Sequence, residues 1–266
     1  MEKLLLIPRA IADLLSVWNG QQTWKQKSSF TYTLALLKLK KWVGQSDTVI
    51  DFPLLRMHWK GCNNETLQYL VKEIFFDEVY QVRSLEANAV IRILDVGSNI
   101  GLSVLYFKTA FPSALIEAFE PSAQSFALLQ QNVEQNDLQQ IKVYQCAITG
   151  NDEPLFFVEG YGPCSQNQQF LPTGNKEQPV PTQRLSELLR NRQYDLVKMD
   201  VEGAELEILN DVIASGCLNK VGCWFIEFHY PLAELEAILN AFKDQGFSSS
   251  RKKDVYCFQK ICNHKY

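Results

Sequence analysis

The chain has 266 residues, of which 46% are hydrophobic and 21% charged, a composition ordinary for a folded globular protein. Its formal net charge is −4, whereas proteins that bind nucleic acids usually carry a strong basic excess. No stretch approaches the roughly 18 continuous apolar residues that a membrane-spanning helix needs. We therefore expect neither nucleic acid nor a membrane as a partner.

The first 88 residues have a helical pattern. Apolar residues recur at helical spacing near the start of the chain, which gives one apolar stripe. The segment 48–59 is less clear, because Pro53 argues against a central strand there. Residues 1–88 are therefore predicted to form a mostly helical N-terminal extension. It either covers the domain that follows or forms a lid or homodimer contact. Its helices are predicted over residues 4–18, 30–43 and 66–76.

From residue 89 onward, short apolar strands alternate with amphipathic helices. This alternation implies right-handed βαβ units and a mostly parallel sheet covered on both faces. Residues 89–266 are therefore predicted to form one doubly wound α/β domain. The predicted strands are 90–95, 114–120, 141–148, 194–200, 221–228 and 255–259, and the predicted helices are 102–111, 123–136, 204–214 and 231–244.

One segment, 160–181, breaks this alternation. It is rich in Gly, Pro, Gln and Asn and shows no apolar period. Long connections without secondary structure are often functional loops, and the alternative is a passive insertion. A functional loop here would help to shape a substrate pocket.

The seven cysteines are scattered and include no CxxC pair, so they predict neither a zinc ribbon nor a disulfide framework. Such a set fits free thiols in a reducing compartment. Near the start of the chain, Pro8, Arg9 and Asp13 interrupt the apolar run too early for a signal peptide. We therefore expect a cytoplasmic protein.

A glycine-containing loop follows the first predicted strand of the α/β domain, where ligands bind in open parallel sheets. Glycine has no Cβ and lets the backbone approach a ligand closely. The dinucleotide fingerprint needs three glycines, and this loop has two, which argues against a nicotinamide dinucleotide. A ligand without phosphates, carrying a carboxylate and a cationic sulfur, fits better. The candidate binding residues in the loop are Asp95, Gly97, Ser98, Asn99 and Gly101.

Three further positions extend this ligand site. Glu120 ends the next predicted strand, where a carboxylate can accept hydrogen bonds from both hydroxyls of a ribose. Asp95 is expected to order the loop and to hold the ligand's ammonium, directly or through water. Cys146 and Ala147 lie near the end of the strand 141–148, where an adenine ring could rest, with core packing as the alternative. Taken alone, Asp95 could be a turn residue and Glu120 a surface charge. Their spacing relative to each other favours a cofactor site.

Three segments resemble the FkbM family of methyltransferases: Asp95–Gly101, Glu117–Pro121 and the run Val-Lys-Met-Asp-Val-Glu-Gly-Ala-Glu at 197–205. The resemblance runs from about residue 93 to 247 and includes Trp-Phe-Ile-Glu-Phe-His at 224–229 and the segment 180–189. Ser98 and Ser186 replace the family's usual alanine and acidic residue. The resemblance implies a class I, Rossmann-like methyltransferase fold with S-adenosyl-L-methionine as cofactor. It also implies, most often, O-methylation of glycans or secondary metabolites.

Polar residues of two strands are expected at the same edge of the sheet. Lys198 and Asp200 face one side of their strand, and Glu227 and His229 bear the same relation on the next. Glu202 follows close by. A hydroxyl acceptor needs a base, for which His229 and Asp200 are candidates. His229 is favoured because histidine titrates near neutral pH, although a structural histidine is the alternative.

A carboxylate acceptor would need positioning and no base, and Lys198 could counter a negative charge on it. Asp, Glu and His together can bind a divalent cation, but no spacing demands one, so we expect no metal. The sequence thus predicts an S-adenosylmethionine-dependent O-methyltransferase acting on a hydroxyl or carboxylate of a small molecule, glycan or peptide. The alternatives are a non-catalytic S-adenosylmethionine-binding module and, less favoured, an NAD-linked oxidoreductase.

Overall fold

The computed structural model describes residues 23–42, 49–52, 57–60, 64–82, 85–86, 89–153, 155 and 179–261. The helix predicted over residues 4–18 and nearly all of the segment 160–181 lie outside the described residues. Within the ranges given, no helix combines the length and the apolar character needed to cross a membrane.

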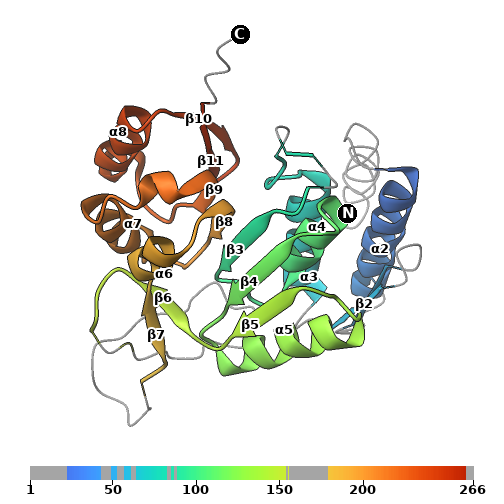
Figure 1. Ribbon diagram of the computed structural model, residues 1–266. Coiled ribbons are helices and arrows are strands. Elements are labelled where there is room, and N and C mark those ends of the chain that lie inside the picture. The colour runs from blue at the N-terminus through green and yellow to red at the C-terminus, as the bar shows by residue number, and fades with distance from the viewer. Residues whose placement is uncertain are drawn as a thin grey trace.

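A seven-stranded sheet occupies the centre of the molecule, with the strand order β10-β11-β9-β8-β3-β4-β5 (Figure 1). All neighbours pair in parallel except β11, which is antiparallel to both β9 and β10. Chain order reverses between β3 and β8, so this sheet has the switch point at which open α/β folds bind ligands. The prediction of a doubly wound, Rossmann-like fold is confirmed. The strands are β3 (Arg92–Val96), β4 (Leu115–Phe119), β5 (Ile141–Tyr144), β8 (Tyr194–Met199), β9 (Val221–Glu227), β10 (Phe247–Lys252) and β11 (Val255–Lys260).

Helices cover both faces of the sheet, and alternate residues of each strand pack on opposite sides. On β3, Ile93 belongs to one hydrophobic cluster and Leu94 to the other, and both are fully buried. The first face packs against α4 (Leu102–Ala110) and α5 (Ala123–Gln135). The opposite face packs against α6 (Leu185–Asn191), α7 (Glu205–Ala214) and α8 (Glu236–Asp244).

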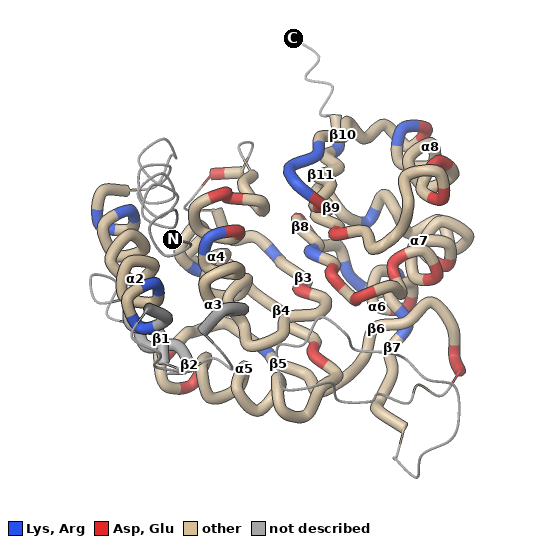
Figure 2. Tube along the Cα trace, turned by 180° about the vertical axis from the view of Figure 1, so that it is seen from behind, with Lys and Arg blue, Asp and Glu red and all other residues tan. Residues whose placement is uncertain are grey.

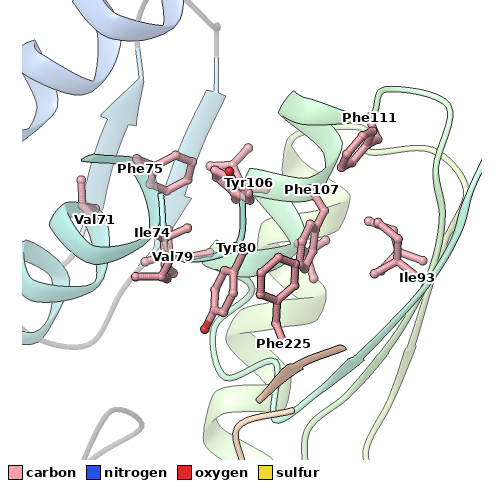
Figure 3. Close-up of a cluster of buried hydrophobic side chains, with 14 of the residues drawn as sticks. Val71, Ile74, Phe75, Val79, Tyr80, Ile93, Tyr106, Phe107, Phe111 and Phe225 are labelled. Carbon is pink, nitrogen blue, oxygen red and sulfur yellow. The ribbon is translucent and has the colours of Figure 1, made fainter. Parts of the chain in front are cut away.

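The described part of the N-terminal region packs onto the first face, beside α4. It comprises α2 (Trp24–Trp42), the antiparallel hairpin of β1 (Val49–Phe52) and β2 (Met57–Lys60), α3 (Asn64–Val71) and a π-helical turn η2 (Lys72–Phe76). Phe75 anchors this contact: its ring centroid lies 4.4 Å from that of Phe30 and 5.8 Å from that of Tyr106. Phe75 and Tyr106 are drawn in Figure 3. The helix predicted over residues 30–43 begins earlier than expected, and the unclear segment contains a hairpin whose first strand ends just before Pro53.

Other differences from prediction lie at the edges of the fold. The strand expected over residues 141–148 is two strands, because after β5 the chain leaves the main sheet. There, β6 (Ala147–Thr149) pairs in parallel with β7 (Thr182–Arg184). The helix expected over residues 231–244 is a 3-10 turn, η4 (Leu232–Glu234), followed by α8. The elements β7, α6, β10 and the 3-10 turn η3 (Leu218–Lys220) were not predicted.

Candidate active site

A cavity of about 460 Å³ opens at the carboxyl ends of β3, β4, β8 and β9. Every predicted site residue lines it except Asp95 and Gly101. Part of the wall was not predicted and comes from the N-terminal region and the β10–β11 turn. Those residues include Tyr69, Glu73, Tyr80 and Asp254.

The loop after β3 needs glycine at position 97 for a steric reason that was not expected. Gly97 has φ +76°, and a Cβ built on it would lie 1.8 Å from the backbone carbonyl oxygen of Asp200. The absent side chain therefore makes room for the chain that follows β8. Gly97 also lines the cavity, so its expected close approach to a ligand stays a prediction. Gly101, with φ +91°, stands at the start of α4, and Asn99 between them also has a positive φ, +49°.

Asp95 lies fully buried beneath this loop. Its Oδ2 accepts a hydrogen bond of 2.5 Å from Ser103 Oγ, and its Oδ1 lies 3.5 Å from Lys198 Nζ. Burial raises the pKa of Asp95, although Lys198 and Ser103 oppose the shift. Its carboxylate thus contacts α4 and β8, and the expected ordering of the loop by Asp95 stays a prediction. It does not line the cavity, so the expectation of direct contact with a ligand ammonium is corrected.

Glu120 lines the cavity at the end of β4, and its carboxylate is fixed by the backbone. Oε2 accepts from Asn99 N at 2.8 Å, and Oε1 accepts from Ser122 N at 2.9 Å. Burial raises the pKa of Glu120 to about 7, against the effect of these two N–H groups. Asn99 Oδ1, at the same end, is buried and accepts no hydrogen bond from the residues the structure describes.

The remaining predicted cofactor residues flank Glu120. Ser98 is held by two hydrogen bonds: Oγ donates to Asp95 O and N donates to Phe119 O. Cys146 and Ala147 lie where the chain passes from β5 to β6 and form the cavity wall beyond Glu120. Cys146 is a half-buried free thiol whose pKa is raised by burial.

Lys198 connects the loop to the neighbouring strand and is only 3% exposed. Its Nζ donates to Gly97 O at 2.6 Å and lies 3.5 Å from Asp95 Oδ1 and 3.6 Å from Asp200 Oδ2. Burial alone would lower the pKa of Lys198, but the surrounding carboxylates outweigh it and the pKa is raised. Its charge already interacts with these two carboxylates, and the expectation that Lys198 counters a charge on the acceptor stays a prediction.

His229 is held between two carboxylates. Its Nδ1 lies 2.8 Å from Oε1 of the fully buried Glu205, and its Nε2 lies 3.4 Å from Glu202 Oε2. The hydrogen bond with Glu205 raises the pKa of His229 to about 9, in spite of desolvation. His229 is therefore mostly protonated at neutral pH. This corrects the argument that favoured it as the base, which assumed an ordinary histidine pKa.

Carboxylates dominate this edge of the cavity. Met199 pairs with Ile226, so Asp200 and Glu227 follow at adjacent positions on neighbouring strands. Burial, together with nearby carboxylates, raises the pKa of Glu202 to about 7 and that of Glu227 to about 8. Figure 2 shows acidic positions near β9 and around the start of α7. These carboxylates lie at the same edge of the sheet, as predicted from the sequence, because parallel strands end at a common edge.

The same edge contains the residues that could hold a metal. One ligand atom from each of Asp200, Glu202 and His229 lies within 4.8 Å of the others. Two carboxylates and an imidazole are ligands that a divalent cation accepts. The expectation of no metal stays a prediction.

Comparison with known proteins identifies relatives of this chain. A family model described as the methyltransferase FkbM domain matches residues 95–249. Methyltransferase sdnD of Sordaria araneosa is 31% identical over 191 residues, covering 59% of this chain and 73% of that protein. The 31-O-demethyl-FK506 methyltransferase FkbM of Streptomyces tacrolimicus is 26% identical over 178 residues, covering 54% and 68%.

A solved structure also matches. The crystal structure of methyltransferase FkbM from Methylobacillus flagellatus KT aligns with a TM-score of 0.49 and 14% identity. The alignment covers 96% of this chain and 60% of that one. At this distance the likeness adds nothing to the fold described above.

Proposed function

Because the chain belongs to the FkbM family of methyltransferases, we propose that it transfers a methyl group from S-adenosyl-L-methionine to an oxygen of a small molecule, glycan or peptide. One observation carries this proposal. A single cavity has Glu120 and the glycine loop at one end and the Glu202–His229 pair at the other. A cofactor and an acceptor could therefore meet inside it.

The first end suits the proposed cofactor. Each oxygen of Glu120 accepts one backbone N–H and keeps a lone pair for a ribose hydroxyl. Asn99 Oδ1 offers another buried acceptor, with no partner among the described residues. Cys146 and Ala147 would form the wall beside an adenine ring. When bound, S-adenosylmethionine supplies an electrophilic methyl group on a cationic sulfur.

The other end suits proton removal from a hydroxyl. A general base works best when its pKa is close to the working pH. Glu202, with a pKa of about 7, meets this requirement better than His229, with a pKa of about 9. We therefore assign Glu202 as the base and His229, fixed by Glu205, as the residue that orients it.

The charge of this edge favours a hydroxyl over a carboxylate acceptor. Asp200, Glu202 and Glu227 would repel an anionic acceptor, and Lys198, the buried cation beside them, is already paired. The name of the Streptomyces tacrolimicus relative also specifies transfer to an oxygen of its own substrate. We keep a carboxylate acceptor as the less favoured form of the proposal.

Two measurements on the purified protein test this proposal. Calorimetry with S-adenosylhomocysteine and with NAD separates a methyltransferase from an oxidoreductase, and tight binding of NAD alone would contradict the proposal. Incubation with methyl-labelled S-adenosylmethionine and panels of sugars, hydroxylated metabolites and peptides then identifies the acceptor. Mass spectrometry should locate the new methyl group on oxygen. Binding without transfer to any class would favour the non-catalytic binding module.

A further inference from the structure

We propose that the cavity wall formed by Glu227, Glu73 and the hydroxyl of Tyr80 binds a protonated amine carried by the acceptor. This inference rests on the proposed function and adds a chemical feature to the acceptor class. The three residues come from β9, from η2 and from the segment that follows η2, so no sequence motif brings them together.

Among the described residues, Glu227 has no ion-pair partner. Its side chain is half-buried and lines the cavity, beside Asp200 on the neighbouring strand. It makes no hydrogen bond or ion pair with any residue in the described ranges. A buried carboxylate of this kind is stabilised when a ligand brings a positive charge to it.

The cations that the structure describes near Glu227 are engaged elsewhere. Lys198 is bound by Gly97 O and lies between Asp95 and Asp200. Lys253 Nζ lies 2.6 Å from Asp77 Oδ2 and 3.4 Å from Glu73 Oε1. His229 lies between Glu202 and Glu205. A cation that pairs with Glu227 would therefore have to come from a bound molecule.

Tyr80 is an independent indication of a ligand at this wall. The side chain is only 5% exposed, and its ring packs at centroid distances of 5.8 Å from Phe107 and 5.7 Å from Phe225. Figure 3 shows its hydroxyl turned away from these rings, and Tyr80 is part of the cavity lining. The hydroxyl makes no hydrogen bond with a described residue. Burial and the nearby carboxylates raise its pKa, so it stays neutral and offers an oxygen lone pair.

Glu73 completes the set of acceptors. It is 5% exposed, and its two contacts, from Tyr69 Oη at 3.1 Å and Lys253 Nζ at 3.4 Å, both fall on Oε1. Its Oε2 has no partner within the part of the chain that the structure describes. Two carboxylates and a tyrosine oxygen match the three N–H donors of an ammonium group.

Because the amine is protonated, it is not the atom that receives the methyl group. A protonated amine has no lone pair and cannot attack the methyl group, so the amine fixes the acceptor while its hydroxyl reacts. The ammonium of the cofactor is the other source of the same chemistry. Glu227 and Glu73 lie on β9 and η2, whereas the proposed cofactor residues lie at the ends of β3 and β4.

The test uses matched pairs of probes and the thermal unfolding of the full chain. Ethanolamine, serinamide and glucosamine are each compared with their N-acetyl derivatives, with and without saturating S-adenosylhomocysteine. We expect the amines to raise Tm more than their neutral partners. Glu227→Gln should weaken amine binding about tenfold or more, and Tyr80→Phe, which keeps the ring packing, should weaken it a few-fold. Glu236→Gln, on α8 outside the cavity, is the matched control and should behave as wild type.

Three results would overturn this inference: amines no better than their N-acetyl partners, a preference that survives Glu227→Gln, or a tenfold loss of S-adenosylhomocysteine affinity in that variant. The last would assign the subsite to the cofactor. Failure of the wild type to bind S-adenosylhomocysteine would instead count against the proposed function. In that case the amine measurements made without S-adenosylhomocysteine would still test the proposed amine subsite.

Discussion

Replacing Glu120 with Gln is the most direct test of the proposed cofactor end. The substitution keeps the shape of the side chain but removes its charge. The backbone N–H groups of Asn99, at 2.8 Å, and Ser122, at 2.9 Å, now donate to the carboxylate. In the glutamine variant, the amide NH₂ would face one of these two donors. A hydrogen bond to a charged acceptor contributes about 1.5–3 kcal/mol. Loss of one such bond to a ribose hydroxyl should weaken S-adenosylhomocysteine binding about 10- to 100-fold.

The pH dependence of this binding gives a second signature. Burial raises the pKa of Glu120 to about 7, and the ionised form is the better acceptor of ribose hydroxyls. Affinity should therefore reach a plateau above pH 7 and fall as the pH decreases through this value. At pH 6 only about one tenth of the carboxyl groups would be ionised, so binding should be about tenfold weaker than on the plateau. Glu120→Gln should lack this limb.

Calorimetry between pH 6 and 8.5 measures both effects. Glu117→Gln is the matched control, because Glu117 lies on the same strand but its carboxylate binds Arg192 and Tyr194, which do not line the cavity. It should bind S-adenosylhomocysteine as wild type does. Equal affinities for wild type and Glu120→Gln, or an equal loss in both variants, would refute the assignment of Glu120.

Three further outcomes are expected. Gly97→Ala should lower the free energy of unfolding in urea by about 3 kcal/mol or more, since its Cβ would lie 1.8 Å from the Asp200 carbonyl oxygen. Gly246→Ala, with φ +80° and no atom within 4 Å of the new Cβ, should cost only about 1–2 kcal/mol. Glu202→Gln should lower kcat by about 10²-fold or more without changing S-adenosylhomocysteine affinity, and an unchanged kcat would exclude Glu202 as base. In the folded protein the pKa is about 7 for Glu202 and about 8 for Glu227, against about 4.5 for an ordinary glutamate. Both groups therefore stabilise the folded state most below pH 4.5, and this contribution is lost as the pH rises through 7 and 8. The Tm of the ligand-free protein should therefore fall between pH 5 and 9, and less steeply in Glu227→Gln.

The proposed cofactor end could be predicted from the sequence because its geometry is local. Each parallel strand ends at the same edge, so the residues after β3 and β4 meet without further information. The loop from Asp95 to Gly101 and Glu120 therefore lie where the pattern predicted. The physical role of Gly97 was not readable, because the crowding atom belongs to Asp200, on a strand that comes much later in the chain.

The part of the cavity wall that comes from the N-terminal region could not be predicted, because it depends on packing between distant segments. Tyr69, Glu73 and Tyr80 reach the cavity only because Phe75 and its neighbours dock on α4. The pKa of His229 depends in the same way on Glu205, which is fully buried at the start of α7. A glutamate in the first turn of a helix is usually exposed, so its pattern gives no warning of this contact.

Two errors in the strand assignment also have local causes. The sequence of β10, Phe-Ser-Ser-Ser-Arg-Lys, has one apolar residue, and all residues after Phe247 are exposed at the edge of the sheet. The run from Ile141 to Ile148 is continuous in composition, but β6 pairs with β7 outside the main sheet. Neither a polar edge strand nor a change of sheet leaves an apolar period to detect.

The division of the cavity between two parts of the chain affects how such enzymes can diverge. The family model matches residues 95–249, which include the glycine loop, Glu120 and the Glu202–His229 pair. Tyr69, Glu73, Tyr80 and Asp254 line the same cavity but lie outside that match. Mutations in this wall can accumulate without disturbing the residues assigned to the transfer step. If this wall contacts the acceptor as proposed, exchange of the segment 64–82 between relatives should change which acceptor is methylated.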